Sequence, residues 1–345
     1  MRRHIAAITA LGATAAAMIA VAPAALAGSP VVEVPISFAV TNTNTTSVPC
    51  VADGEDYTVR GTLVAPQEAV ESGGAVSLLL HAVTFDQDYW QFDGVEGYDA
   101  ARRLAEQGHA IVAVDRLGYG SSDRPGGLDT CFGSEADVAH QMVRALRAGD
   151  YELDGASAPA FDRVYLGGSS VGGMIANLAA SHYGGVDGVL NLAWGDFAAS
   201  PYAATEVADV SRRCLLGGDP GEEPFYAVFA KDSIDTFYFS SAEQAVRDAV
   251  PAPKADPCGQ LLSLGPALTV DTALLARIDA PVLVQFGDAD AVFPPPAAEL
   301  QAARYLGSPE VTTSIVEGAS HYPLLEANHE QAVADIAAWL DARTG

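Results

Sequence analysis

The chain has 345 residues, 49% of them hydrophobic, and its 44 acidic against 18 basic residues give a formal net charge of −26. This length suits one large α/β domain with an insertion and is enough to bury a sizeable core. Nucleic acids and anionic membranes repel such an acidic surface, so neither is an expected partner, and neutral or cationic small molecules are favoured as substrates. Nothing in the composition predicts an oligomeric state.

The first 27 residues have the pattern of a secretory signal peptide. Arg2 and Arg3 form a positive start, residues 5–21 are apolar and rich in alanine, and residues 25–27 (Ala-Leu-Ala) form a small-x-small cleavage signal. A membrane anchor is the alternative, but the stretch is only weakly apolar and the cleavage signal favours removal. We therefore expect a secreted protein whose mature chain begins at Gly28.

Four cysteines follow the predicted signal peptide: Cys50, Cys131, Cys214 and Cys258. An even number in an exported chain predicts two disulfides, and three pairings are possible. We favour Cys214 with Cys258, because both lie in the insertion described below, and Cys50 with Cys131. No cysteine or histidine cluster has metal-ligand spacing, so neither a metal site nor a cofactor is expected.

Strands and helices alternate through the first half of the chain. Strands are predicted at 31–40, 57–64, 76–81, 109–115, 161–167 and 186–193, and helices at 98–107, at about 134–147 and at 171–183. Ser134 is the expected N-cap of the second helix, which has acidic residues in its first turn.

The alternation breaks between residues 196 and 270, an aromatic-rich stretch that contains Cys214 and Cys258. We interpret 196–270 as a mainly helical cap, inserted into an α/β core formed by 28–195 and 271–345. After it, helices are predicted at 271–278, 296–305 and 322–342, and strands at 281–286 and 311–316. Apolar strands alternating with helices predict a mostly parallel sheet covered by helices on both faces.

The most informative motif is Gly168-Ser169-Ser170-Val171-Gly172, which separates an apolar strand from an alanine-rich helix. It fits the nucleophile-elbow pattern Gly-x-Ser-x-Gly, and only Ser170 is in register with both glycines. A plain glycine- and serine-rich turn is the alternative. The choice depends on whether an acid and a histidine follow in the right order.

Candidates for the acid follow two apolar strands. Asp288 and Asp290 come directly after the strand at 281–286, where active sites of parallel sheets form, and Asp196 follows the strand at 186–193. We prefer Asp290, which lies three residues after Gly287. Each of the three could instead be a turn aspartate that accepts hydrogen bonds from backbone N–H groups.

The candidate base is His321, in a small-residue loop between the strand at 311–316 and the last predicted helix. The serine, acid and histidine then occur in the order that acyl transfer on a parallel α/β sheet uses. The developing oxyanion needs two N–H donors. Val171 at the helix start is one, and Val83, with Ala82 as the alternative, is expected to supply the other.

Four motifs in this order resemble those of a known family. His81-Ala82-Val83 is similar to a strand followed by His-Gly, with Ala82 in place of the glycine, and residues 115–122 are close to Asp-x-Arg-Gly-x-Gly-x-Ser, with the arginine shifted by one. Gly-x-x-Asp ends at Asp290, and Gly-x-x-His ends at His321. From about residue 57 to the C-terminus the chain resembles the α/β-hydrolases that carry a cap after the sixth strand.

The resemblance implies an α/β-hydrolase fold and a serine hydrolase that forms an acyl-enzyme, with Asp115 as a structural residue. Serine at the elbow argues against epoxide hydrolases and haloalkane dehalogenases, which have an aspartate nucleophile there. Carboxylic esters are the expected substrates. A secreted aminopeptidase or amidase, a lactonase, and a non-catalytic binding protein on the same scaffold are the alternatives.

Overall fold

The computed structural model describes residues 29–344, so the predicted signal peptide lies outside the described residues. Its main strands are β1 (Val31–Thr41), β2 (Asp56–Pro66), β3 (Gly74–Leu80), β4 (Ala110–Asp115), β5 (Glu152–Leu153), β6 (Phe161–Ser169), β7 (Gly188–Leu192), β10 (Val282–Gly287) and β11 (Val311–Val316). They form one sheet in the order β11-β10-β7-β6-β3-β4-β2-β1-β5. The strands from β11 to β4 are parallel, whereas β2, β1 and β5 pair antiparallel.

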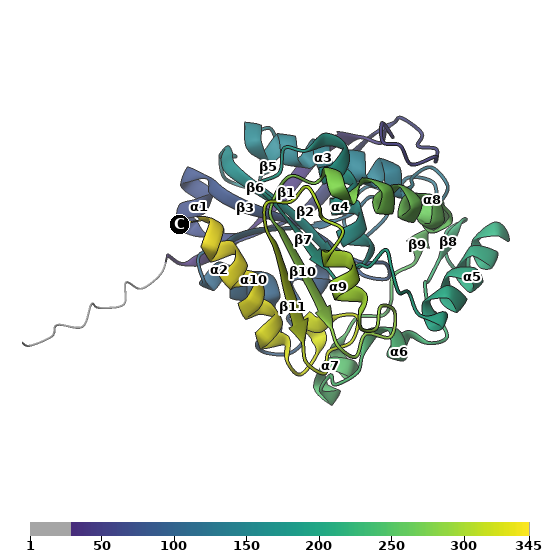
Figure 1. Ribbon diagram of the computed structural model, residues 1–345. Helices are drawn as coiled ribbons and strands as arrows, with labels where there is room; N and C mark the ends of the chain where they lie inside the picture. The colour runs from purple at the N-terminus through teal and green to yellow at the C-terminus, as the bar shows by residue number, and fades with distance from the viewer. Residues whose placement is uncertain (1–28, 345) are drawn as a thin grey trace, which may run out of the picture.

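Helices cover both faces of this sheet. They are α1 (Gln67–Ser72), η1 (Gln87–Tyr89), α2 (Ala100–Glu106), α3 (Phe132–Ala148), α4 (Val171–Tyr183), α9 (Ala297–Ala302), η3 (Pro323–Leu325) and α10 (His329–Thr344). Figure 1 shows α2 and α10 on one side of the sheet and α3 and α4 on the other. The strands β4, β7 and β10 are buried along their whole length, as their mainly apolar sequences predict. The predicted α/β-hydrolase fold is confirmed.

The chain between β7 and β10, residues 193–281, is called the inserted segment here. It contains α5 (Pro201–Leu215), β8 (Tyr226–Ala227), α6 (Ile234–Tyr238), α7 (Gln244–Ala249), β9 (Asp256–Pro257), α8 (Cys258–Leu274) and η2 (Leu275–Arg277). Its longest helix, α8, packs against α3, α4 and α5 (Figure 1). This helix therefore joins the inserted segment to the helices that follow β4 and β6.

Three predicted helix boundaries are wrong. Ser134 is not the N-cap of α3, because the helix begins two residues earlier and the Ser134 hydroxyl accepts a hydrogen bond from the Cys131 N–H from inside the first turn. The helix predicted at 271–278 is instead the end of α8 followed by η2, and α8 runs through Pro266, a residue that normally interrupts helices. The helix predicted at 322–342 is divided into η3 and α10.

Two disulfides connect elements that are distant in the sequence. Cys50–Cys131 joins the loop after β1 to the N-terminus of α3, with 6.2 Å between the Cα atoms. Cys214–Cys258 joins the end of α5 to the start of α8, with 5.3 Å between the Cα atoms. The favoured pairing is confirmed. Among the helices of residues 29–344, none is both long and apolar enough to cross a membrane.

Candidate active site

Ser170 lies at the turn where β6 ends and α4 begins. Its backbone has φ 53° and ψ −123°, a strained conformation for a residue that carries a side chain. A Cβ atom on Gly172 would lie 2.3 Å from the Leu80 carbonyl oxygen, and one on Gly168 would lie 2.5 Å from the Gly172 carbonyl carbon. The two glycines of the motif therefore allow the tight turn that presents the Ser170 hydroxyl beside the N-terminus of α4.

The structure brings the three preferred residues together in one hydrogen-bonded chain. His321 Nε2 lies 2.8 Å from Ser170 Oγ, and His321 Nδ1 lies 2.9 Å from Asp290 Oδ2. Ser170, Asp290 and His321 are 4%, 2% and 0% exposed, so water competes little for these contacts. Because a carboxylate only accepts, His321 Nδ1 carries the proton and Nε2 is free to accept one from the serine.

Asp290 is also held from its other side. Its Oδ1 accepts hydrogen bonds from the N–H groups of Val292 and Phe293, at 2.7 and 3.1 Å. These two bonds fix the orientation of the carboxylate, so that Oδ2 faces the imidazole. The alternative that the sequence leaves open for Asp290 is a turn aspartate that accepts backbone hydrogen bonds. Asp290 does accept such bonds, and they help to orient it toward His321.

The two other candidate acids have different partners. Asp288 is exposed, and its Oδ1 accepts a hydrogen bond from the Gly318 N–H at 2.6 Å. Asp196 accepts from Trp194 Nε1 at 3.1 Å and from Gln301 Nε2 at 3.2 Å. Neither is hydrogen-bonded to His321. The geometry therefore selects Asp290 as the partner of the histidine.

The expected oxyanion donors lie next to the serine. Val83 and Val171 both line the cavity onto which Ser170 and His321 open, whereas Ala82 is fully buried and does not line it. In the described part of the chain, no hydrogen-bond acceptor faces the N–H of Val83 or of Val171. Two donors without partners beside a serine are the arrangement that a developing oxyanion requires. This placement favours Val83 over Ala82.

Burial and a fixed tautomer keep His81, which precedes this loop, uncharged. Its Nδ1–H donates to the Ala82 carbonyl oxygen at 2.7 Å, and its Nε2 accepts from the Arg116 N–H at 3.0 Å. Burial, together with the Arg116 charge, lowers the pKa of His81 well below its usual value. Asp115 accepts from the N–H groups of Gln87 and Ser121, so its contacts are those of a residue that organises loops.

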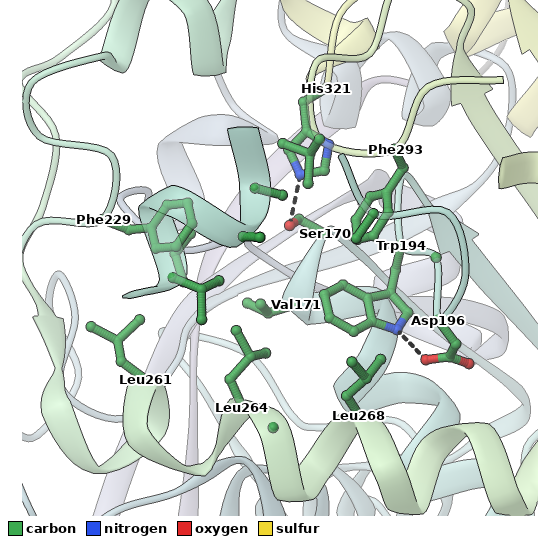
Figure 2. A pocket seen from close by; sticks show the side chains of 18 of the residues that line it. Ser170, Val171, Trp194, Asp196, Phe229, Leu261, Leu264, Leu268, Phe293 and His321 are labelled. Atoms are coloured by element: carbon green, nitrogen blue, oxygen red, sulfur yellow. Dashed lines mark hydrogen bonds between the residues drawn. The ribbon is translucent and has the colours of Figure 1, made fainter. Parts of the chain in front are cut away.

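An apolar cavity of about 240 Å³ opens beside Ser170. Figure 2 shows the serine and histidine at one end of it, Trp194 and Phe293 on one side, Phe229 on the other, and leucines of α8 along the floor. Small residues of α5, Ala203 and Ala204, also line it. Most of the residues that line the cavity thus come from the inserted segment, and the cavity is suited to an apolar group attached to the atom that Ser170 would attack.

Sequence reasoning missed a carboxyl pair at this cavity, formed by Asp196, which lines it, and the buried Asp271. Trp194 Nε1 donates to Asp196 Oδ1 and to Asp271 Oδ2, both at 3.1 Å, so the two carboxyl groups converge on one N–H. Burial raises the pKa of Asp196 to about 6, and burial and the neighbouring Asp196 raise that of Asp271 well above its usual value. Asp271 was visible in the sequence only as a helix residue, because its partner lies 75 positions earlier. Among residues 29–344, no three His, Cys, Asp or Glu side chains are grouped to hold a metal ion.

Comparison with known proteins agrees with this architecture. The chain is similar to a thermophilic esterase from Thermogutta terrifontis, with a TM-score of 0.61 and 22% identity over 89% of this chain and 100% of that chain. It is also similar to a monoacylglycerol lipase from Paleococcus ferrophilus, with a TM-score of 0.60 and 18% identity over 79% and 97% of the two chains. A bromoperoxidase from Bacillus anthracis has a TM-score of 0.56 and 18% identity over 87% and 100%. At these identities the likeness concerns the fold.

A search of curated protein sequences finds no match to the chain. The model of the alpha/beta hydrolase family, by contrast, matches residues 78–336. This match includes the end of β3, the elbow, the loop with Asp290 and the loop with His321, and it covers most of the chain. The protein belongs to the alpha/beta hydrolase family.

Proposed function

We propose that the protein is a secreted serine hydrolase that cleaves carboxylic esters through an acyl-enzyme intermediate. The observation that carries this proposal is the hydrogen-bonded chain Ser170–His321–Asp290, which opens onto an apolar cavity. Family membership and the similar fold of esterases and lipases support hydrolysis of an ester as the reaction class. The N-terminal sequence pattern and the two disulfides support secretion.

Acylation begins when Ser170 Oγ attacks the ester carbonyl carbon and its proton moves to His321 Nε2. Asp290 keeps the imidazole oriented and stabilises the positive charge that forms on it. The N–H groups of Val83 and Val171 receive the oxyanion, aided by the N-terminal end of α4. The tetrahedral intermediate then collapses, the alcohol leaves with the proton from His321 Nε2, and the acyl group stays on Ser170.

Deacylation repeats these steps with water. His321 Nε2 takes a proton from a water molecule as its oxygen attacks the acyl carbon, and then returns the proton to Ser170 Oγ as the acid leaves. We further propose that residues 196–270 act as a cap, since α5 and α8 wall the cavity and would contact the apolar part of the ester. The substrate class is therefore an ester with an apolar acyl chain.

The test combines turnover with labelling of the nucleophile. Purified protein should hydrolyse p-nitrophenyl butyrate and react with a fluorophosphonate probe, and Ser170→Ala should lose about 10⁴-fold or more in kcat and take up no probe. Ser169→Ala is the matched control, because this neighbouring serine is out of register with the motif. If Ser170→Ala retains labelling or turnover, Ser170 is not the nucleophile.

A further inference from the structure

The turn that carries Val83 is held in place by the inserted segment. Thr84, the next residue, has φ 64°, a left-handed conformation that is unfavourable for a β-branched residue. Such a conformation persists only where surrounding contacts determine it. Three of these contacts come from residues 154 to 172 positions further along the chain.

Each contact holds a different atom of Thr84. Asp256 Oδ1 accepts from the Thr84 N–H at 2.8 Å, the Lys254 N–H donates to the Thr84 carbonyl oxygen at 2.8 Å, and the Tyr238 hydroxyl donates to Thr84 Oγ1 at 2.8 Å. The N–H, the carbonyl and the side chain are therefore all fixed from the inserted segment. Asp256 is the only side-chain acceptor among the three partners.

The peptide unit that carries the Val83 N–H is held from the core side as well. Its carbonyl belongs to Ala82 and accepts from His81 Nδ1, and more weakly from Arg116 Nη2 at 3.5 Å. Because a peptide unit is planar, fixing the carbonyl on one side directs the N–H to the other. His81 and Arg116 thus set one end of the turn, and Asp256 sets the other.

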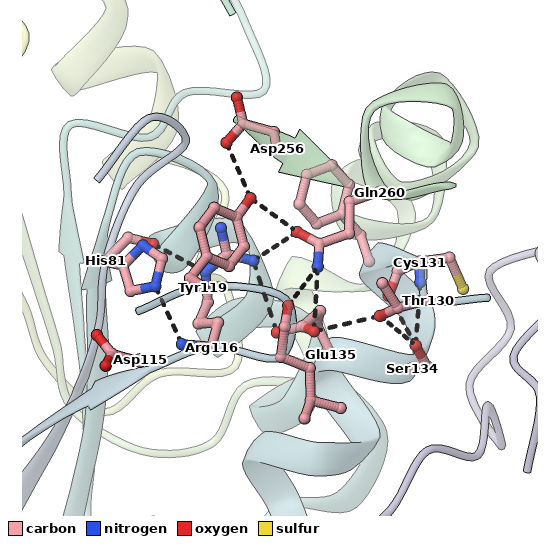
Figure 3. A network of polar contacts seen from close by, with 12 residues as sticks. His81, Asp115, Arg116, Tyr119, Thr130, Cys131, Ser134, Glu135, Asp256 and Gln260 are labelled. Atoms are coloured by element: carbon pink, nitrogen blue, oxygen red, sulfur yellow. Dashed lines mark hydrogen bonds and ion pairs between the residues drawn. The ribbon is translucent and has the colours of Figure 1, made fainter. Parts of the chain in front are cut away.

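Asp256 is itself built into a buried network, part of which Figure 3 shows. Its Oδ1 also accepts from the Tyr119 hydroxyl at 2.9 Å, and its Oδ2 accepts from the Phe229 N–H at 3.2 Å. Arg116 reaches across to Gln260 on α8 at 2.7 Å. Since Phe229 lines the cavity, one carboxylate joins the cavity wall to the turn beside Ser170.

We propose that Asp256 is a positioning residue for the oxyanion hole, so that the inserted segment supplies part of the catalytic geometry as well as the cavity wall. This proposal rests on the proposed function, in which the Val83 N–H receives the oxyanion. Asp256 does not touch the substrate. It acts through Thr84, and loss of its contact would let the Val83 N–H turn away from the oxyanion.

The decisive variant is Asp256→Asn, which keeps the shape of the side chain. An amide has only one acceptor oxygen. It can replace Oδ1, which accepts from Thr84 and Tyr119, or Oδ2, which accepts from Phe229, but not both. With p-nitrophenyl butyrate we expect kcat to fall about 10- to 100-fold, because a displaced oxyanion donor costs rate, while KM stays within about twofold. A trifluoromethyl ketone, whose adduct with Ser170 carries an oxyanion, should bind more weakly by the same factor as kcat/KM falls.

Asp219→Asn is the matched control. Asp219 is another buried carboxylate of the inserted segment that accepts from a backbone N–H, that of Val228 at 3.1 Å, but it does not contact residues 81–84. This variant should keep kcat and the affinity for the ketone, whatever its thermal stability. Should Asp256→Asn fail to fold, Tyr238→Phe takes its place, since it removes only a hydroxyl group and should lower kcat about 3- to 10-fold with KM unchanged.

The outcomes separate this proposal from the proposed function. If the wild type is active and labelled at Ser170, but Asp256→Asn folds and retains kcat within about twofold, the positioning role is wrong. A fall in kcat without weaker ketone binding also overturns it, because the loss then lies outside the oxyanion hole. If the wild type neither hydrolyses esters nor takes up the fluorophosphonate, the proposed function fails, and the positioning role fails with it.

Discussion

At the scale of single residues, the loop after β10 gives different surroundings to two aspartates that occupy similar positions in the sequence. Asp288 and Asp290 lie two positions apart, and both accept hydrogen bonds from backbone N–H groups. Only Asp290 has its second oxygen against an imidazole, because the bonds from Val292 and Phe293 turn its carboxylate inward. The same loop therefore contains both the candidate catalytic acid and its natural control.

Replacing each aspartate with asparagine tests this difference. Asp290→Asn should lower kcat about 10³- to 10⁴-fold, because an amide NH₂ facing His321 Nδ1 favours the tautomer that cannot accept the serine proton. Asp288→Asn should keep kcat within about threefold, since its side chain is exposed and is not hydrogen-bonded to His321. The measurement is p-nitrophenyl butyrate hydrolysis at saturating substrate. The reverse ranking of the two variants would show that the acid is misassigned.

At the scale of elements, we expect α5 and α8 to determine which esters fit. Leu264 and Leu268 project from α8 into the cavity beside Ser170 (Figure 2), and α5 contributes the small residues Ala203 and Ala204 to its lining. A larger side chain here would shorten the space available for an apolar chain without touching the triad. We thus expect α5 and α8, which lie outside the parallel sheet, to limit the length of the acyl chain that the cavity accepts.

Leu264→Trp should therefore change selectivity more than rate. We expect kcat/KM for p-nitrophenyl octanoate to fall about tenfold or more, while the value for the acetate changes less than about threefold, since each lost methylene contact costs part of the binding energy. Leu216→Trp, at the exposed end of α5, is the control and should leave both values unchanged. Equal losses for the two esters in Leu264→Trp would mean that the acyl chain lies elsewhere.

The elements also show which features the sequence could predict. β3, β4, β6 and β10 are mainly apolar, and the loops at the carboxyl ends of β3, β6 and β10 bring together Val83, Ser170 and Asp290 by topology alone. The path of α8 through Pro266 could not be predicted, because tertiary packing outweighs the local preference of proline. The contact of Asp256 with Thr84 spans 172 positions and has no local sequence signal.

At the scale of the whole molecule, several carboxyl groups are buried rather than exposed on the acidic surface. Burial raises the pKa of Asp196 and Asp256 to about 6 and that of Glu135 to about 7, even though Arg116 lies 3.5 Å from Glu135. Burial and the nearby Asp196 raise the pKa of Asp271 well above its usual value. In the unfolded chain these groups titrate near their usual values, at about pH 4. Between about pH 4 and pH 7 these carboxyl groups therefore bind more protons in the folded protein than in the unfolded chain.

Stability should consequently fall as the pH rises through this range, because the state that binds more protons is favoured at lower pH. We expect the midpoint of thermal unfolding to be higher at about pH 5.5 than at about pH 8. The histidines His81, His109 and His140, whose pKa burial lowers, oppose this trend between about pH 5 and pH 7. The carboxyl groups with lowered pKa, such as Asp123 and Asp219, oppose it only below about pH 4.

Salt and one substitution separate this effect from the general repulsion of a chain with a net charge of −26. Repulsion between exposed charges is screened at about 0.5 M NaCl, whereas titration of buried groups is not, so most of the pH dependence should remain. In the wild type, the acid form of Asp271 supplies a proton beside Asp196. Asp271→Asn puts an N–H donor there that does not titrate, so this variant should flatten the pH dependence of the unfolding midpoint. A midpoint that rises steadily from pH 5.5 to pH 8, or a slope that Asp271→Asn leaves unaltered, would show that these buried carboxyl groups do not control the stability.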